Sequence, residues 1–427
     1  MSISRPARRC RFGQPSPSLG RDNRNLVRHE VNPAQEEENG LKLAKRLTRL
    51  GTETAFDVLV KAKALEAAGK EIIHLEIGEP DFPTPINVIR AATEALQSGY
   101  THYCAPAGLQ ELRESLASEV SHTRGVQISS DWIVVTPGAK PIMFYLILAL
   151  VEEGDEVIYP NPGFPIYESM INFVGGTPIA LPLREEYQFR FDVKDLIARV
   201  TARTKLIIIN SPQNPTGGLL TRSDIEAIAE IAIQRDITVL SDEIYSRIIY
   251  EGSHTSIASL PGMLERTVIL DGFSKTYAMT GWRLGFGVLP PFLHGHISKL
   301  VTNSVSCTAP FAQRAGLEAL ANTRSDVSSM VDEFRRRRDF VVQKLNDIPG
   351  IRCLSPAGAF YVFPNIKSFG RQSSEFADYL LNEAGVAVLS GTSFGEYGEG
   401  YLRISYANSI ENLDKAIHRI REATAGL

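Results

Sequence analysis

The 427-residue sequence has few cysteines and no long apolar run. Its four thiols, Cys10, Cys104, Cys307 and Cys353, lie far apart and form no Cys-x-x-Cys pair. Neither a disulfide framework nor a zinc site is therefore indicated, and the pattern is typical of a reducing compartment. The longest apolar run, 142–151, is half of the about 20 residues that a membrane-spanning helix requires. This excludes a transmembrane protein and predicts no membrane partner.

An excess of charge of either sign is also missing. Lys and Arg total 45 and Asp and Glu total 49, so the formal net charge is −4. General nucleic-acid binding requires a basic excess that competes for phosphate charge, so no nucleic-acid partner is predicted. His294 and His296 lie two residues apart, but no carboxylate or thiol cluster stands nearby. We therefore predict a polar loop after the proline pair 290–291, and no metal site.

Residues 1–40 differ in composition from the rest of the chain. Arginines alternate there with Pro, Ser, Gly and Asn, an acidic run follows at 36–38, and no hydrophobic periodicity is present. This predicts a disordered N-terminal extension. An organelle transit peptide and a mis-assigned start codon are alternatives, whereas the lack of an apolar stretch argues against a secretion signal. We expect a cytoplasmic protein.

Predicted helices and strands alternate after the extension. Helical spacing predicts helices over 54–68, 86–97 and 140–151, and apolar runs predict strands over 72–77, 132–136, 205–209, 237–240 and 267–270. Ser223 and Glu226 predict a capping box for a helix that runs to about residue 234. The alternation predicts an α/β fold with a mainly parallel sheet.

The pattern changes from about residue 326 to a long charged helix, followed by short strands near 358–363 and 401–405. We predict four parts: the extension 1–40, an N-terminal segment of a small domain 41–80, a large ligand-binding domain 81–325, and a small C-terminal α+β domain 326–427. The arginine run 335–338 could bind an anion. Acidic residues stand beside it, however, so we expect a solvated helix face.

Ligands of open α/β sheets bind at the carboxyl ends of the strands. Asn214, Asp242 and Lys275 follow three predicted strands, and Gly138 opens a helix whose unpaired N–H groups suit a phosphate. A lysine amine, such a helix start and an arginine suit a phosphorylated aldehyde bound covalently to the amine. A buried carboxylate facing a ring nitrogen keeps that nitrogen protonated, so that the ring accepts electrons. These features together predict pyridoxal 5′-phosphate (PLP).

The sequence of residues 272–285, GFSKTYAMTGWRLG, resembles the lysine signature of the class I/II aminotransferase family, which are fold-type I PLP-dependent enzymes. Further motifs of that family recur in order over about 45–425: GEPDFPTP (78–85), YCAPAG (103–108), GAK (138–140), NPGF (161–164), NPTG (214–217), DEIY (242–245) and YLRIS (401–405). The resemblance implies a large PLP-binding domain with a mainly parallel central sheet and a smaller α+β domain. Some relatives carry a hydroxyl residue where this chain has Gly272, so that phosphate contact is expected to be absent or to come from Ser274 or water.

The resemblance also implies the contacts of the cofactor ring. Lys275 bonds to the cofactor aldehyde and moves a proton at the substrate Cα. Asp242 pairs with the ring nitrogen, and Tyr245 and Asn214 contact the ring oxygen. Phe164 stacks on the ring, as any flat aromatic side chain can. Lys275, Asp242 and Tyr245 are thus the expected catalytic residues.

The remaining implied roles concern the phosphate and the substrate. The expected phosphate contacts are Arg283, Ser274 and the N–H groups of Ala139 and Lys140. Tyr103 is expected to reach the phosphate of a neighbouring subunit, which implies a homodimer. Arg403 is expected to bind the substrate α-carboxylate through a bidentate fork that lysine cannot reproduce. Gly78 and Asn214 complete the expected substrate site.

The sequence therefore predicts a PLP-dependent aminotransferase. The predicted reaction moves the amino group of an L-amino acid, aspartate-type by default, to a 2-oxo acid such as 2-oxoglutarate by a ping-pong mechanism. No second arginine can be assigned to a side-chain carboxylate, so alanine, aromatic and branched-chain donors stay open. A carbon–sulfur β-lyase on the same fold is the alternative. A PLP-sensing transcription regulator would need a winged-helix domain, for which residues 1–45 hold no periodic helices.

Overall fold

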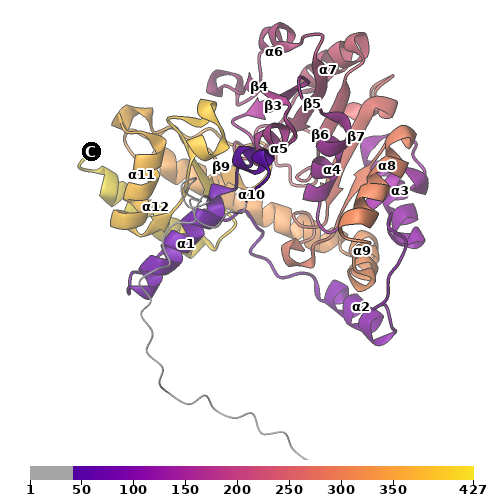
Figure 1. Ribbon diagram of the computed structural model, residues 1–427. Coiled ribbons are helices and arrows are strands. Elements are labelled where there is room, and N and C mark those ends of the chain that lie inside the picture. Colours follow the sequence, from indigo (N-terminus) through magenta and orange to yellow (C-terminus); the bar gives the residue numbers. More distant parts are fainter. Residues whose placement is uncertain (1–41) are drawn as a thin grey trace, which may run out of the picture. The chain divides into compact units, whose positions relative to one another are not determined.

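The structure, a computed structural model, describes residues 42–427, so the extension predicted over 1–40 lies outside the described residues. Residues 46–427 pack as one unit. Its central sheet has seven strands in the order β2-β8-β7-β6-β5-β3-β4 (Figure 1). Their bounds are Ile133–Thr136 (β2), Gly285–Val288 (β8), Thr267–Gly272 (β7), Thr238–Asp242 (β6), Thr204–Asn210 (β5), Glu156–Asn161 (β3) and Thr177–Pro182 (β4). Only β8 runs antiparallel to its neighbours, so the predicted mainly parallel sheet is confirmed.

Helices cover both faces of this sheet. One face packs against α4 (Lys140–Leu150), α5 (Ile166–Val174) and α8 (Pro291–Ser304), and the other against α6 (Val193–Arg199) and α7 (Arg222–Arg235). Near β2 and β8 lie α2 (Ile86–Gln97), α3 (Gln110–Arg124) and α9 (Pro310–Asn322). Because the middle strands are buried on both sides, their sequences are continuously apolar instead of alternating.

A second hydrophobic cluster surrounds α10 (Arg324–Asn346) and α12 (Ile410–Thr424). A small antiparallel sheet, β11-β12-β9, belongs to it, with bounds Leu389–Ser390, Leu402–Ser405 and Tyr361–Val362. The early strand β1 (Ile73–His74) pairs in parallel with β10 (Val386–Ala387). In Figure 1, α1 (Thr54–Ala67, indigo) lies beside α11 (Ser373–Tyr379), and Lys61 of α1 pairs with Asp378 of α11 at 3.2 Å. The domain boundaries at 80/81 and 325/326 stay predictions.

The polar loop predicted around His294 and His296 is wrong. Both histidines lie within α8, which begins at Pro291. Proline suits a first helical position, because the N–H that it lacks would have no partner there. Within residues 42–427, no three His, Cys, Asp or Glu side chains are grouped to hold a metal ion.

The solvated face predicted for the arginine run of α10 is half wrong. Arg336 is exposed, but Arg337 and Arg338 are buried. Arg337 pairs with Asp81 at 2.7 Å and Arg338 with Glu251 at 2.9 Å. These carboxylates lie far away in the sequence, so the local charge pattern could not reveal them.

The capping box predicted at Ser223 and Glu226 is also wrong, because the helix start lies two residues earlier. Thr221 caps α7: its hydroxyl accepts the N–H of Asp224 at 3.2 Å, and the Asp224 carboxylate accepts the N–H of Thr221 at 2.8 Å. Ser223 lies in the first turn, where its hydroxyl shares a 2.9 Å hydrogen bond with that of Thr221. The pair Thr221–Asp224 and the predicted pair Ser223–Glu226 have the same spacing, but only Thr221 lies where the chain enters the helix.

We expect Thr221→Ala to lower the free energy of unfolding by about 1 kcal/mol, because the N–H of Asp224 loses its acceptor. Ser223→Ala is the matched control and should change the free energy by less than about 0.5 kcal/mol. Urea unfolding followed by circular dichroism measures both. Equal losses for the two variants would contradict the position of the cap.

Candidate active site

The carboxyl ends of β5, β6 and β7 and the start of α4 open on one cavity of about 870 Å³. Phe56 and Leu59 of α1 and Arg403 of β12 form other parts of its wall. Among the residues that line it are eleven of the twelve predicted site residues: Gly78, Ala139, Lys140, Phe164, Asn214, Asp242, Tyr245, Ser274, Lys275, Arg283 and Arg403. Segments from the whole length of residues 46–427 therefore meet at one site.

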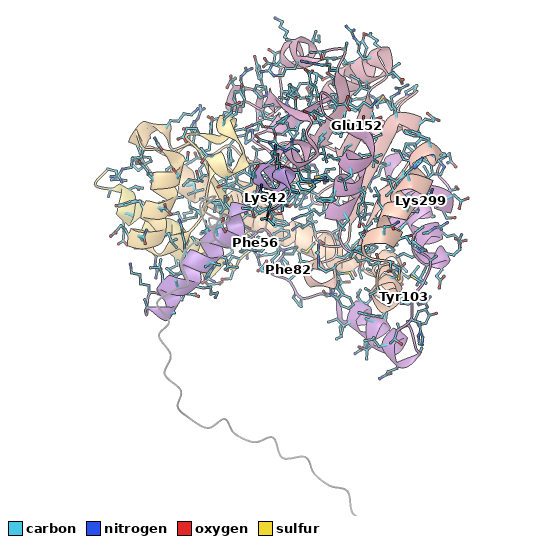
Figure 2. The ribbon with its side chains drawn as sticks, viewed as in Figure 1. Lys42, Phe56, Phe82, Tyr103, Glu152 and Lys299 are labelled. Atoms are coloured by element: carbon cyan, nitrogen blue, oxygen red, sulfur yellow. The ribbon has the colours of Figure 1, made fainter. Side chains whose placement is uncertain are left out.

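Tyr103 is the predicted site residue that does not line this cavity. It lies between α2 and α3, and its side chain is 88% exposed (Figure 2). Its contact with a neighbouring subunit stays a prediction.

The Lys275 amine lies deep in the cavity. It donates a hydrogen bond to the carbonyl oxygen of Gly78 at 2.5 Å and lies 5.8 Å from the centre of the Phe360 ring. Burial and the nearby Arg403 charge lower the pKa of Lys275 to about 8. A larger share of this amine than of an exposed lysine is therefore unprotonated near neutral pH, as attack on an aldehyde requires.

Asp242 ends β6 and is buried. Its carboxylate accepts hydrogen bonds from the Tyr167 hydroxyl at 2.6 Å and from the N–H of Ile244 at 3.2 Å. Burial nevertheless raises the pKa of Asp242 to about 6. A cation at this carboxylate would oppose that shift, so the environment fits the protonated ring nitrogen of PLP.

Arg403 is buried and only partly hydrogen-bonded. It donates to the Asn214 side-chain oxygen at 3.2 Å and to the carbonyl oxygen of Glu76, but its Nε–H has no partner. The guanidinium packs between the rings of Tyr361 and Phe394 at 4.6 and 4.9 Å from their centres. Burial lowers the pKa of Arg403, yet a guanidinium stays charged in proteins. A buried cation with an unpaired N–H fits an incoming carboxylate.

Two glycines shape an anion cradle beside the N-terminus of α4. Gly138 has φ +86°, and a Cβ there would lie 2.2 Å from Nη2 of Arg283. A Cβ at Gly285 would lie 2.3 Å from the Ala139 nitrogen. The missing side chains let the Arg283 guanidinium approach the N–H groups that open α4. A cation beside a helix N-terminus fits the phosphate of PLP.

Sequence reasoning missed two tyrosines that line the site, Tyr167 and Tyr361. The hydroxyls of Tyr245 and Tyr361 share a hydrogen bond of 2.8 Å, and burial raises the pKa of both, so each phenol keeps its proton. Tyr361 also touches Gly78, where a Cβ would lie 2.1 Å from its hydroxyl. Tyr361 and Tyr167 stand in no recognisable motif. Asn210 could have been found, since it directly follows the predicted strand 205–209; in the structure it donates to the Asp242 carbonyl at 3.1 Å.

A half-buried lysine amine, a buried carboxylate and a glycine-lined anion cradle thus share the carboxyl edge of a mainly parallel sheet. With this sheet, they define a PLP-dependent enzyme of fold type I. The chain belongs to the family described as aminotransferase class I and II, whose model matches residues 70–420. Members of this family are PLP-dependent, and the chain is an aminotransferase.

Two relatives and one solved structure illustrate the similarity. Aspartate aminotransferase of Pyrococcus abyssi is 44% identical over 361 residues, which are 83% of this chain and 92% of the relative. Aromatic-amino-acid aminotransferase 2 of Thermococcus litoralis is 41% identical over 355 residues, 82% of this chain and 91% of the relative. The structure of aspartate aminotransferase from Thermus thermophilus with maleate has a TM-score of 0.86 at 36% identity, covering 90% of this chain and all of that one.

Proposed function

We propose that this aminotransferase moves the amino group of an aspartate-type L-amino acid to a 2-oxo acid such as 2-oxoglutarate by a ping-pong mechanism. The observation that carries the proposal is the buried Arg403, which lines the same cavity as Lys275 and whose Nε–H has no hydrogen-bond partner. An amino acid held there by its α-carboxylate would present its amine and Cα to the lysine.

Bound PLP supplies a covalent anchor for the donor amine and an electron sink for the pair left at Cα. Lys275 takes the Cα proton, and its lowered pKa of about 8 suits an amine that accepts and returns protons near neutral pH. Asp242 holds the proton on the ring nitrogen. Tyr245 and Asn214 contact the ring oxygen, and Phe164 stacks on the ring.

The phosphate contacts in this proposal are Arg283, Ser274 and the N–H groups of Ala139 and Lys140. The Nε–H of Arg403 has no partner and could donate to a carboxylate. The donor and the acceptor both carry an α-carboxylate, so they would bind to this arginine in turn. Alternate occupancy of one site supports a ping-pong order.

Lys140 supports an acidic donor. Its ammonium lies 5.2 Å from the centre of the Phe164 ring and pairs with the carboxylate of Glu53, which precedes α1. A side-chain carboxylate of the substrate could take the place of Glu53 on this lysine. The Thermus structure named above contains maleate, a four-carbon dicarboxylate, and the Pyrococcus relative is named for aspartate.

Aromatic donors are the second candidate at the same site. Phe56, Leu59 and Ile77 line the cavity, and Phe56 of α1 is 59% exposed (Figure 2). An aromatic side chain would bury this surface. The Thermococcus relative is named for aromatic amino acids.

The homodimer is part of the proposal as well. The exposed phenol of Tyr103 is free to contact a second subunit, and tyrosine is enriched in protein interfaces. Between residues 42 and 427, every helix is too short or too polar to cross a membrane. The cytoplasmic location stays a prediction.

The first half of the reaction can be tested without an acceptor. Adding L-aspartate to the PLP-loaded enzyme should release about one equivalent of 2-oxo acid per site and no ammonia, since the amine stays on the enzyme. Lys275→Ala should release none, because no group takes the Cα proton. Continuous release of ammonia by the unsubstituted enzyme would contradict amine transfer.

We expect Lys140→Met to raise the KM for L-aspartate about tenfold or more, the loss expected for one charge-assisted hydrogen bond. The KM for L-phenylalanine should change less than about twofold, since this donor has no side-chain carboxylate. Steady-state kinetics with both donors measure the split. Glu53→Gln is the control and should not raise the KM for aspartate. Equal effects of Lys140→Met on both donors would contradict the acidic-donor proposal.

A further inference from the structure

A buried ionic cluster lies next to Asp242 but outside the cavity. Arg124, the last residue of α3, donates from Nε to the carboxylate of Glu243 at 2.9 Å. Its Nη2 donates to the carboxylate of Asp271 and to the Ser246 hydroxyl, the latter at 2.7 Å. Arg124, Glu243 and Asp271 are all buried, and none of them is among the residues that line the cavity.

Three carboxylates gather on the adjoining ends of two strands. Asp242 ends β6 and Glu243 follows it, while Asp271 lies near the end of β7, which pairs in parallel with β6. Arg124 bridges the second and third of these carboxylates. It therefore joins the two strand ends and brings a positive charge to a crowded group of acids.

The neighbours of Glu243 keep it ionised. Burial by itself would raise its pKa, but His254, whose Nε2 lies 3.1 Å from the carboxylate, and Arg124 hold the pKa of Glu243 well below its usual range. The hydroxyls of Ser241 and Ser256 also donate to it, at 2.9 and 2.6 Å. Glu243 is thus a permanent negative charge beside Asp242.

The same cluster acts on Asp271. Burial raises the pKa of Asp271 to about 6, and the Arg124 charge and the Gly272 N–H oppose that rise. Asp242 faces Tyr167 from α5 and Tyr245 from the turn after β6, and both phenols are neutral. The charges that raise the pKa of Asp242, after burial, are those of Asp271 and Glu243.

We propose that Arg124 is a positioning residue that keeps Asp242 ionised for the cofactor by neutralising Glu243 and Asp271 and by tying the ends of β6 and β7 together. The inference rests on the proposed pairing of Asp242 with the PLP ring nitrogen. Without the Arg124 charge, the carboxylates beside Asp242 are under-compensated, and Asp242 takes up a proton at a higher pH. PLP binding then weakens at a higher pH than in the unsubstituted protein.

The test titrates the full-length apoprotein with PLP from pH 6 to pH 8.5 and compares each variant with the unsubstituted protein at the same pH. Protonation of free PLP then cancels from the ratio of Kd values. Arg124→Met should bind PLP about fivefold more weakly at pH 6 if the pKa of Asp242 rises from about 6 to about 7, and nearly equally at pH 8.5. Glu243→Gln should shift the ratio the other way and strengthen binding at pH 6.

The double variant Arg124→Met/Glu243→Gln removes one charge of each sign. At each pH, its Kd for PLP should therefore lie within about threefold of the Kd of the unsubstituted protein. Lost packing alone would weaken binding at every pH, and a second buried substitution would not repair it. A ratio for Arg124→Met that does not depend on pH, or a double variant weaker than both singles, would overturn the inference.

Asp242→Asn separates this inference from the proposed function. The variant should bind PLP more weakly than the unsubstituted protein at pH 8.5, and adding Arg124→Met to it should produce no further pH-dependent loss. If Asp242→Asn binds PLP normally, the proposed role of Asp242 is wrong. If Asp242→Asn weakens binding but Arg124→Met has no pH-dependent effect, only the role of Arg124 is wrong.

Discussion

A carboxylate buried at the end of a central strand is the constraint on which this site depends. Removing Asp242 from water favours its neutral form, whereas the chemistry of PLP requires the charged form opposite the ring nitrogen. The Tyr167 hydroxyl and the Ile244 N–H stabilise the charge from one side. Arg124 offsets the neighbouring acids from the other. In the function and the inference that we propose, these buried polar contacts at the ends of β6 and β7 support the charge of Asp242.

The sheet topology explains how distant segments reach this carboxylate. Parallel strands bring Asn210, Asp242 and Gly272 to the same edge, because β5, β6 and β7 run in the same direction and end at these residues. The second hydrophobic cluster adds Arg403 from β12. Pairing of β1 with β10 brings the segment with Gly78 to the same cavity. The proposed substrate contacts therefore come from the early and late parts of residues 46–427, and the proposed cofactor contacts come from the middle.

The sequence predicted those parts of the site that follow strands or belong to motifs. The strand at 205–209, the helix starting at Lys140 and the lysine signature all lie where local periodicity and spacing indicated. The sequence could not reveal contacts between remote positions, such as those of Tyr361 with Gly78 or of Arg337 with Asp81. The prediction of the α7 cap failed for a different reason. Two overlapping residue pairs have the spacing of a capping box, and only the position at which the helix begins decides between them.

The proposed chemistry of this site depends most directly on which lysine holds the cofactor. Three lysines, Lys63, Lys140 and Lys275, line the cavity, and borohydride reduction of the PLP-loaded protein makes the bond between cofactor and lysine permanent. Peptide mapping by mass spectrometry then locates the added mass. We expect the label on Lys275, whose half-buried amine has the lowered pKa. A label on Lys63 or Lys140, with Lys275 unmodified, would contradict it.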